Sequence, residues 1–309
     1  MGDIKGKVVL AGGSGFVGRN LSVYLRSKGS DVVVLTRATV PSNKIDGVKY
    51  VTWDGRHKEV WAEELEGAAA VINLAGKNVN CRFTKQNKLQ IVQSRVESAA
   101  VLADAFATCN QPPGVFIQCS AVGYYGDTAV ECDENSVAGN TFLAEVCRKL
   151  EGTLDAFSPE GTRKVVLRLG VVLGRDGGAY PMLASAVNSL MGGTVGNGLQ
   201  YMSWIHIDDL CGILLEAIEN EAMAGVYNAV APGAVSNKDF MAALRKDLRK
   251  PWSPPVPEFI IRAVTGPMGS NSDLILHGQN VVPQRLLDNN YQFKYRGLSG
   301  ALGDLSRKE

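Results

Sequence analysis

The first thirty-seven residues constrain the fold most, because they combine two apolar runs, a glycine-rich turn and a helical pattern in one order. Residues 7–11 form the first apolar run, and GGSGFVG follows at residues 12–18. Leu21 and Leu25 then recur at helical spacing, and DVVVL begins at residue 31. This order predicts a strand, a turn, a helix and a second strand that together hold a dinucleotide.

The glycine-rich turn has the composition of a phosphate-binding loop. Gly12 allows the tight turn, Gly15 lets backbone N–H groups approach a pyrophosphate, and Gly18 allows the helix to pack closely on the strand. The pyrophosphate would lie at the positive N-terminus of the helix. We therefore predict that the whole loop contacts the cofactor, through Gly12, Gly13, Ser14, Gly15, Phe16, Val17 and Gly18.

The end of the second predicted strand indicates which dinucleotide is preferred. An acidic residue there would accept a hydrogen bond from the ribose 2′-hydroxyl of NAD, whereas an arginine offers planar donors to the 2′-phosphate of NADP. Thr36 and Arg37 stand at this end, and no Asp or Glu does. The sequence therefore favours NADP(H), with a solvent-exposed Arg37 on a loop as the alternative interpretation.

Composition narrows the class of protein. The 309 residues are 45% hydrophobic and carry a formal net charge of +1, without a long run of one sign, so we expect neither a nucleic-acid nor a membrane partner. The predicted first strand starts too early for a signal peptide, and no 18-residue apolar stretch follows, which predicts a cytoplasmic protein. The six cysteines are scattered and form no CxxC pair, so no metal site is predicted.

Strand-like and helix-like segments alternate through the first 175 residues, and the strand-like segments are continuous apolar runs. Such runs are typical of strands buried on both faces, so we predict an α/β fold with a Rossmann-type, doubly wound parallel sheet. The dinucleotide-binding domain would cover residues 1–175, with residues 206–230 returning to it. Residues 176–205 and 231–309 would form substrate-side loops and a small, mainly helical C-terminal cap.

Several motifs resemble the extended short-chain dehydrogenase/reductase superfamily: GGSGFVG, NLAG at residues 73–76, CSAVGYYG at 119–126 and HIDDL at 206–210. More narrowly, WIHIDDL, GVVLGRDGG, YNAVAP and VVPQRLL look like an epimerase-like family with plastid- or cell-division-associated members and a human short-chain dehydrogenase homologue. The resemblance implies that Asp54 contacts the adenine. It also implies that Leu74, Ala75 and Gly76 line the ribose and nicotinamide side of the cofactor.

The resemblance breaks at the catalytic residues. Active members of the superfamily use a tyrosine and, four residues later, a lysine that lowers the tyrosine pKa. Aligning the helix on Glu151 puts Leu143 and Cys147 at these two positions, and no tyrosine stands between Gly126 and Tyr180. The chain therefore looks like an atypical member, which keeps the cofactor site and lacks the usual acid–base pair.

Other residues are candidates for the missing proton donor. Tyr124 and Tyr125 follow the fifth predicted strand, and Ser120 would assist one of them by hydrogen bonding, although an alignment on the Tyr125–Gly126 pair puts Ala121 at the hydroxyl position. The alternative is that both tyrosines form an aromatic wall. Arg95 is a candidate positive neighbour, or a contact of the cofactor phosphate or ribose.

The histidine in WIHIDDL is better explained by structure than by catalysis. Its motif opens a helix, and we expect Asp208 or Asp209 to be the N-cap, which leaves His206 a structural role.

The leading functional hypothesis is an NADP-dependent oxidoreductase or epimerase-like enzyme that acts on a small carbonyl or hydroxyl substrate. The alternative is a cofactor-sensing binding protein linked to cell or organelle division, with little or no catalysis. The resemblance also implies a homodimer built from the two long helices that flank the sheet.

Overall fold

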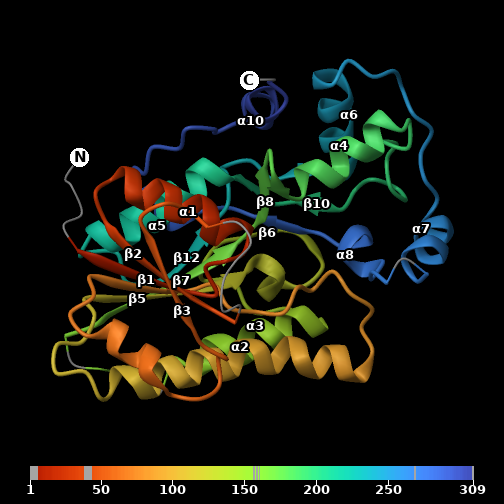
Figure 1. The fold of residues 1–309 in the computed structure, drawn as a ribbon. Coiled ribbons are helices and arrows are strands. Elements are labelled where there is room, and N and C mark those ends of the chain that lie inside the picture. Colours follow the sequence, from red (N-terminus) through yellow and green to blue (C-terminus); the bar gives the residue numbers. More distant parts are fainter. Residues whose placement is uncertain are drawn as a thin grey trace.

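The computed structural model describes residues 6–37, 44–155, 157, 159, 161–267 and 269–307. Its centre is a parallel sheet of seven strands in the order β12-β7-β5-β4-β1-β2-β3 (Figure 1). In this order the strands are Gly225–Ala229, Arg163–Leu169, Val115–Ala121, Ala70–Asn73, Lys7–Ala11, Asp31–Thr36 and Val48–Thr52. The direction of winding reverses between β1 and β4, where ligands of open α/β sheets bind. The predicted Rossmann-type sheet is confirmed.

The strands are apolar on both faces because helices cover both faces. Helices α1 (Phe16–Ser27) and α5 (Ile207–Glu219) lie above the sheet, and α2 (Lys85–Phe106) and α3 (Phe142–Gly152) lie below it (Figure 1). In β1, Val8 and Leu10 pack in the cluster shared with α1 and α5, whereas Val9 packs in the cluster shared with α2. A continuous VVL run is therefore what the middle of this sheet requires.

The remaining elements connect the sheet to the C-terminal region. The 3₁₀ helices are η1 (Val60–Leu65) and η2 (Val122–Tyr125). The short strands are β6 (Thr128–Cys132), β8 (Val171–Gly174), β9 (Gly177–Gly178), β10 (Tyr201–Met202), β11 (Trp204–His206), β13 (Val235–Ser236) and β14 (Gln279–Val281). The other helices are α4 (Tyr180–Asn188), α6 (Asn237–Asp247), α7 (Glu258–Thr265), α8 (Asp273–Leu276), α9 (Gln284–Asp288) and α10 (Leu298–Leu305).

The C-terminal region is mainly helical and has an apolar cluster of its own. Helices α4, α6 and α10 lie together beside the upper layer (Figure 1), and Tyr180, Phe240 and Leu302 are buried between them. Helices α7 and α8 lie at the far end of the molecule from the N-terminus. The mainly helical cap is thus confirmed, while the boundaries of the two predicted units remain predictions.

The start of α5 differs from the sequence-based expectation. The prediction that Asp208 or Asp209 caps this helix is wrong: His206 is the N-cap, and its Nδ1 accepts the backbone N–H of Asp208 at 3.1 Å. The Asp209 carboxylate is directed elsewhere, because it accepts the backbone N–H groups of Lys294 and Tyr295 at 2.6 and 2.9 Å. Aspartates that precede an apolar run predict an N-cap, but here Asp209 is used in a long-range tether to residues 294 and 295.

This cap makes stability depend on pH. Burial lowers the pKa of His206, against the opposing effect of Asp208 and Asp304 nearby. The unfolded chain takes up a proton at the ordinary histidine pKa of about 6.5, and the folded protein resists it, so the free energy of unfolding falls as pH drops through this value. We expect His206→Asn, which keeps an N-cap acceptor without titrating, to weaken this dependence. Urea unfolding between pH 5.5 and 7.5 tests it; equal pH slopes in both proteins would contradict the assignment.

Candidate dinucleotide and catalytic site

The glycine-rich loop between β1 and α1 leaves no room for side chains at Gly12, Gly13 and Gly18. Gly12 has a φ of +73°, and a Cβ there would lie 2.7 Å from the Cα of Ala75. A Cβ on Gly18 would lie 2.3 Å from the carbonyl oxygen of Gly13. Gly12 and Gly18 therefore hold the turn and the helix close to the neighbouring backbone.

Gly15 is different, because it faces open space. It is the N-cap of α1 at φ −76°, and a Cβ there would meet only the Gly12 carbonyl oxygen, 4.0 Å away. No side chain caps this end of α1, so its first N–H groups lack an acceptor within the helix. Open space above free N–H donors at a helix N-terminus fits a pyrophosphate.

The rest of the loop is anchored to its surroundings. Thr36 donates its hydroxyl hydrogen to the Ser14 hydroxyl at 3.1 Å, which joins the loop to the end of β2. The Phe16 ring fills the space beside Gly174 and Gly177, and Val17 packs against the core under α1 and α5. Gly13 lies against Leu10. The loop is therefore held in place before any ligand arrives.

We expect Gly15→Val to abolish tight cofactor binding while leaving the fold intact. The φ of Gly15 suits any residue, and the valine side chain would occupy the space above the α1 N-terminus. Losing two charge-assisted hydrogen bonds raises the NADPH dissociation constant by about a hundredfold or more. Fluorescence titration with NADPH measures it, and circular dichroism checks the fold. Wild-type affinity in a folded variant would show that the loop is misassigned.

The two residues expected near the adenine side occupy contrasting surroundings. Arg37 is exposed and forms no hydrogen bond or ion pair with the residues that the structure describes. Asp54 accepts the backbone N–H groups of Arg56 and His57 and contacts the His57 ring at 2.6 Å. The two backbone hydrogen bonds, from His57 first, lower its pKa to about 2. Asp54 therefore shapes the turn after β3, and an adenine contact remains a prediction.

The loop after β4 lies directly beside the glycine-rich loop. The backbone N–H of Leu74 donates to the Ala11 carbonyl, and that of Ala75 to the Asn73 side chain at 3.0 Å. Arg95 supports the far side of Gly76 and donates through Nη1 to the Lys77 and Ile91 carbonyls, both at 3.1 Å. Burial lowers the pKa of Arg95. Its described contacts thus hold the loop in position; a direct contact with the cofactor stays a prediction.

Leu143 and Cys147, which the alignment on Glu151 predicts to stand at the positions of the acid–base pair, lie where α3 packs on η2. A Cβ on Gly123 would lie 3.3 Å from the Cβ of Leu143, and the Cys147 thiol donates to the Ala121 carbonyl at 3.5 Å. Burial raises the pKa of Cys147. An aliphatic side chain and a buried neutral thiol therefore lie at the end of β5, and their replacement of an acid and a cation stays a prediction.

A buried polar network surrounds the candidate proton donors. Ser120 donates to Glu151 at 2.7 Å, and Arg168 donates to the same carboxylate through Nε and Nη2 at 3.0 and 2.8 Å. Arg168 also donates through Nη1 to the Tyr125 hydroxyl at 2.9 Å, and that hydroxyl donates to Asn228 at 2.7 Å. Ser120 and Tyr125 are therefore already engaged inside the protein.

The two tyrosines differ as proton donors. Tyr125 is 3% exposed, and burial raises its pKa to about 12. Tyr124 is partly exposed, and the Arg168 guanidinium carbon lies 3.4 Å from its ring centroid. Its hydroxyl has no hydrogen-bond partner among the described residues. It also borders a hollow of about 380 Å³ whose walls include Glu151 and the first residues of β12, Gly225 and Val226, so this hollow lies away from the dinucleotide loops.

Comparison with known proteins decides the family. Residues 8–229 match the NAD dependent epimerase/dehydratase family, and residues 256–305 match a domain of unknown function, DUF1731. The chain belongs to the epimerase/dehydratase family. The epimerase family protein SDR39U1 of Homo sapiens is 34% identical over 97% of this chain and 99% of its own length. A chloroplastic SDR39U1 homologue of Arabidopsis thaliana is 35% identical over 96% of this chain and 85% of its own.

Solved structures agree with this membership of the epimerase/dehydratase family. A crystal structure of human SDR39U1 with NADPH superposes with a TM-score of 0.86 at 33% identity and covers 97% of this chain and 99% of that one. A nucleoside-diphosphate sugar epimerase from Corynebacterium glutamicum gives 0.75 at 31% identity, over 96% of this chain and 57% of that one. The resemblance stated from the motifs is thus confirmed.

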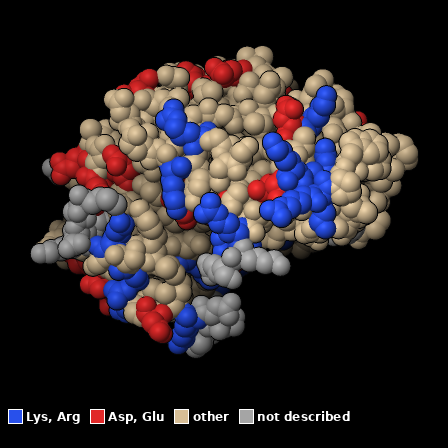
Figure 2. Space-filling model, turned by 90° about the horizontal axis from the view of Figure 1, so that it is seen from above, with Lys and Arg blue, Asp and Glu red and all other residues tan. Residues whose placement is uncertain are grey.

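Charged side chains are distributed unevenly over the face of the molecule that lies above α1 and α5 (Figure 2). Figure 2, from above α1 and α5, shows Lys and Arg atoms mainly across the middle of this face and Asp and Glu atoms toward its left and upper edges. Among the described residues, no helix is long and apolar enough to cross a membrane, and no cluster of His, Cys, Asp or Glu is arranged for a metal ion. The cytoplasmic location and the homodimer stay predictions, since the plant relative is named as chloroplastic.

Sequence reasoning missed the central residue of the polar network. Arg168 stands inside the apolar strand KVVLRLG and is 4% exposed. A lone arginine in a run expected to be buried on both faces indicates a buried partner, because a buried charge is otherwise costly. That signal was present in the sequence, but it did not identify Glu151 or Tyr125 as the partners.

Proposed function

We propose that this chain binds NADPH in the loop between β1 and α1. The observation that carries the proposal is the uncapped N-terminus of α1, with open space above Gly15 and the exposed Arg37 at the end of β2. The NADPH-bound structure of human SDR39U1, 33% identical to this chain, supports it. Gly12, Gly13, Ser14, Phe16, Val17, Gly18 and Thr36 would complete the loop side of the site, with Asp54, Leu74, Ala75, Gly76 and Arg95 on the adenine and ribose sides.

Arg37 should determine the choice between the two nicotinamide cofactors. Its guanidinium can form a charge-assisted contact with a 2′-phosphate, which NADH lacks. We expect Arg37→Ala to reduce the preference for NADPH over NADH by about 1.5–3 kcal/mol, and to leave NADH affinity unchanged. Fluorescence titration with both cofactors measures the preference. Arg26→Ala, an exposed arginine in the last turn of α1 and far from the glycine-rich loop, is the control. Equal NADPH and NADH affinities in the unaltered protein would overturn the assignment.

We further propose that the protein is an oxidoreductase for a small carbonyl or hydroxyl compound. Bound NADPH supplies a hydride, so the chain has to orient the substrate and deliver one proton to the nascent oxygen. Tyr125 and Ser120 are engaged in the buried network, whereas the Tyr124 hydroxyl has no partner among the described residues. Tyr124 is therefore the favoured donor, with water as the alternative source. Glu151 holds Arg168 against the Tyr124 ring, and Ser120 donates to Glu151.

A cofactor-sensing protein linked to cell or organelle division is the second candidate. Leu143 and Cys147 favour it, because they provide no proton relay at the usual positions. A panel of aldehydes, ketones and quinones separates the two functions. Carbonyl-dependent oxidation of NADPH supports the oxidoreductase; NADPH binding without turnover of any member of the panel supports the sensor.

A further inference from the structure

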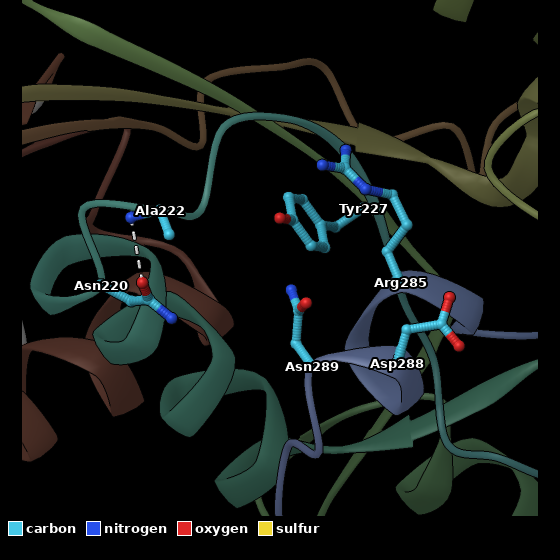
Figure 3. Close-up of a pocket in the computed structure, with 6 residues that line it drawn as sticks. All are labelled: Asn220, Ala222, Tyr227, Arg285, Asp288 and Asn289. Atoms are coloured by element: carbon cyan, nitrogen blue, oxygen red, sulfur yellow. Dashed lines mark hydrogen bonds between the residues drawn. The ribbon is translucent and has the colours of Figure 1, made fainter.

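A second hollow lies at the edge of the sheet opposite the dinucleotide loops. It measures about 360 Å³ and is lined by Asn220, Ala222, Tyr227, Arg285, Asp288 and Asn289 (Figure 3). Asn220 and Ala222 follow α5 and precede β12, so the hollow lies toward the amino end of this strand. The dinucleotide loops follow the carboxyl ends of the strands. The two places are therefore separate.

Tyr227 marks this hollow as a place for a ligand. Only 1% of the residue is exposed, yet its hydroxyl has no hydrogen-bond partner among the described residues. Figure 3 shows the hydroxyl directed into the hollow, toward the turn that carries Asn220 and Ala222. A buried phenol normally finds a partner for its hydroxyl group. The partner at this position must come from the solvent side.

The ring of Tyr227 is held rigidly, so its hydroxyl direction is preset. The Arg285 guanidinium carbon lies 4.0 Å from the ring centroid, and Arg285 donates to the carbonyls of Val226 and Ala224 at 2.6 and 2.9 Å. The guanidinium therefore covers the aromatic face, and its N–H groups donate to backbone carbonyls. A ligand would approach the hydroxyl edge of the ring instead of stacking on it.

The other lining groups offer neutral hydrogen bonds. The carboxamide of Asn289 is exposed and forms no side-chain hydrogen bond to the described residues. The Asn220 carboxamide is already engaged, because it donates to Glu216 at 2.8 Å and accepts the backbone N–H of Ala222 at 3.0 Å, so it holds the wall of the hollow in place. The single cation, Arg285, is balanced by the single anion, Asp288. Hydroxyl and carboxamide groups both donate and accept, and a polyol does the same with adjacent hydroxyls.

We propose that this hollow binds a small neutral polyol, of the size of a monosaccharide, through Tyr227 and Asn289. The volume lies at the lower end of the range for small-molecule sites, which fits such a ligand. This site is independent of the proposed function, because it lies away from the glycine-rich loop.

Ligand-observed NMR on the full chain saturated with NADPH tests the proposal, with myo-inositol and glucose as probes. We expect both to bind, and we expect Tyr227→Phe and Asn289→Ala each to weaken binding by about threefold to tenfold, as the loss of a neutral hydrogen bond implies. The Phe variant keeps the ring under Arg285, so the fold is preserved. Tyr24→Phe, on α1, removes a hydroxyl outside the hollow and should leave binding unchanged.

Three results would overturn the proposal. The first is that neither polyol binds the NADPH-saturated protein, and the second is that affinity is unchanged in both hollow variants. The third is tighter binding of glucose 6-phosphate than of glucose, because the Arg285 charge would then select an anion. If the unaltered protein fails to bind NADPH, the same titrations are run on the NADPH-free protein, so the two proposals fail separately.

Discussion

Replacing Glu151 by Gln is expected to lower the free energy of unfolding by about 3 kcal/mol, the lower end of the range for breaking a buried ion pair. The side chains of Arg168 and Glu151 are 4% and 13% exposed, and two hydrogen bonds join them. An amide at residue 151 keeps one acceptor but leaves the guanidinium charge uncompensated inside the protein. Urea unfolding at pH 7 measures the loss.

Two controls separate the buried charge from a general effect on α3. Glu145→Gln removes an exposed ion pair with Lys149 on the same helix and should change stability little. The double variant Glu151→Leu with Arg168→Met removes both charges and should recover most of the lost stability, because apolar pairs replace buried ion pairs at little cost. A Glu151→Gln protein within about 0.5 kcal/mol of wild type would show that the network contributes little.

We expect Tyr124→Phe to slow carbonyl reduction by about 10²–10⁴-fold, the range for loss of a general acid. Phenylalanine keeps the ring that lies over the Arg168 guanidinium and removes only the hydroxyl. The NADPH dissociation constant should not change, because Tyr124 lies outside the glycine-rich loop. Single-turnover oxidation of bound NADPH, with a carbonyl compound found active in the panel, measures the step.

Tyr125→Phe is the matched control for this reaction. Its hydroxyl joins Arg168 to Asn228 inside the protein, so its loss should lower stability by about 1–3 kcal/mol and leave the reduction rate nearly unchanged. An unchanged rate in Tyr124→Phe would assign the proton to water. A large rate loss in Tyr125→Phe alone would reverse the roles of the two tyrosines.

Local sequence patterns predicted the sheet and the glycine-rich turn well. Strands β1 and β2 are short runs buried on both faces, and their composition is set by that burial. Helix α2 begins at Lys85 because Thr84 caps its start by accepting the Asn87 N–H, a signal contained within one turn. Such signals act over a few residues and are therefore readable along the chain.

Contacts between distant residues were not predictable in the same way. Tyr125 and Asn228 are 103 residues apart, and the motif around His206 gives no sign that residues 294 and 295 take the Asp209 carboxylate. Helix α3 ends at Gly152, since glycine is a poor helix former. The packed fold determines which polar groups become hydrogen-bond partners. Local sequence propensity says little about such long-range pairs.

The tether between Asp209 and the backbone of Lys294 and Tyr295 also has a consequence for biosynthesis. The carboxylate leaves the ribosome 85 and 86 residues before the two N–H groups that it binds. Until then, the Asp209 carboxylate in the first turn of α5 is hydrated and lacks its two backbone donors. The sheet strands that precede α5 can assemble during translation, but the layer above them cannot be completed until this late segment emerges, which gives chaperones a defined interval in which to act.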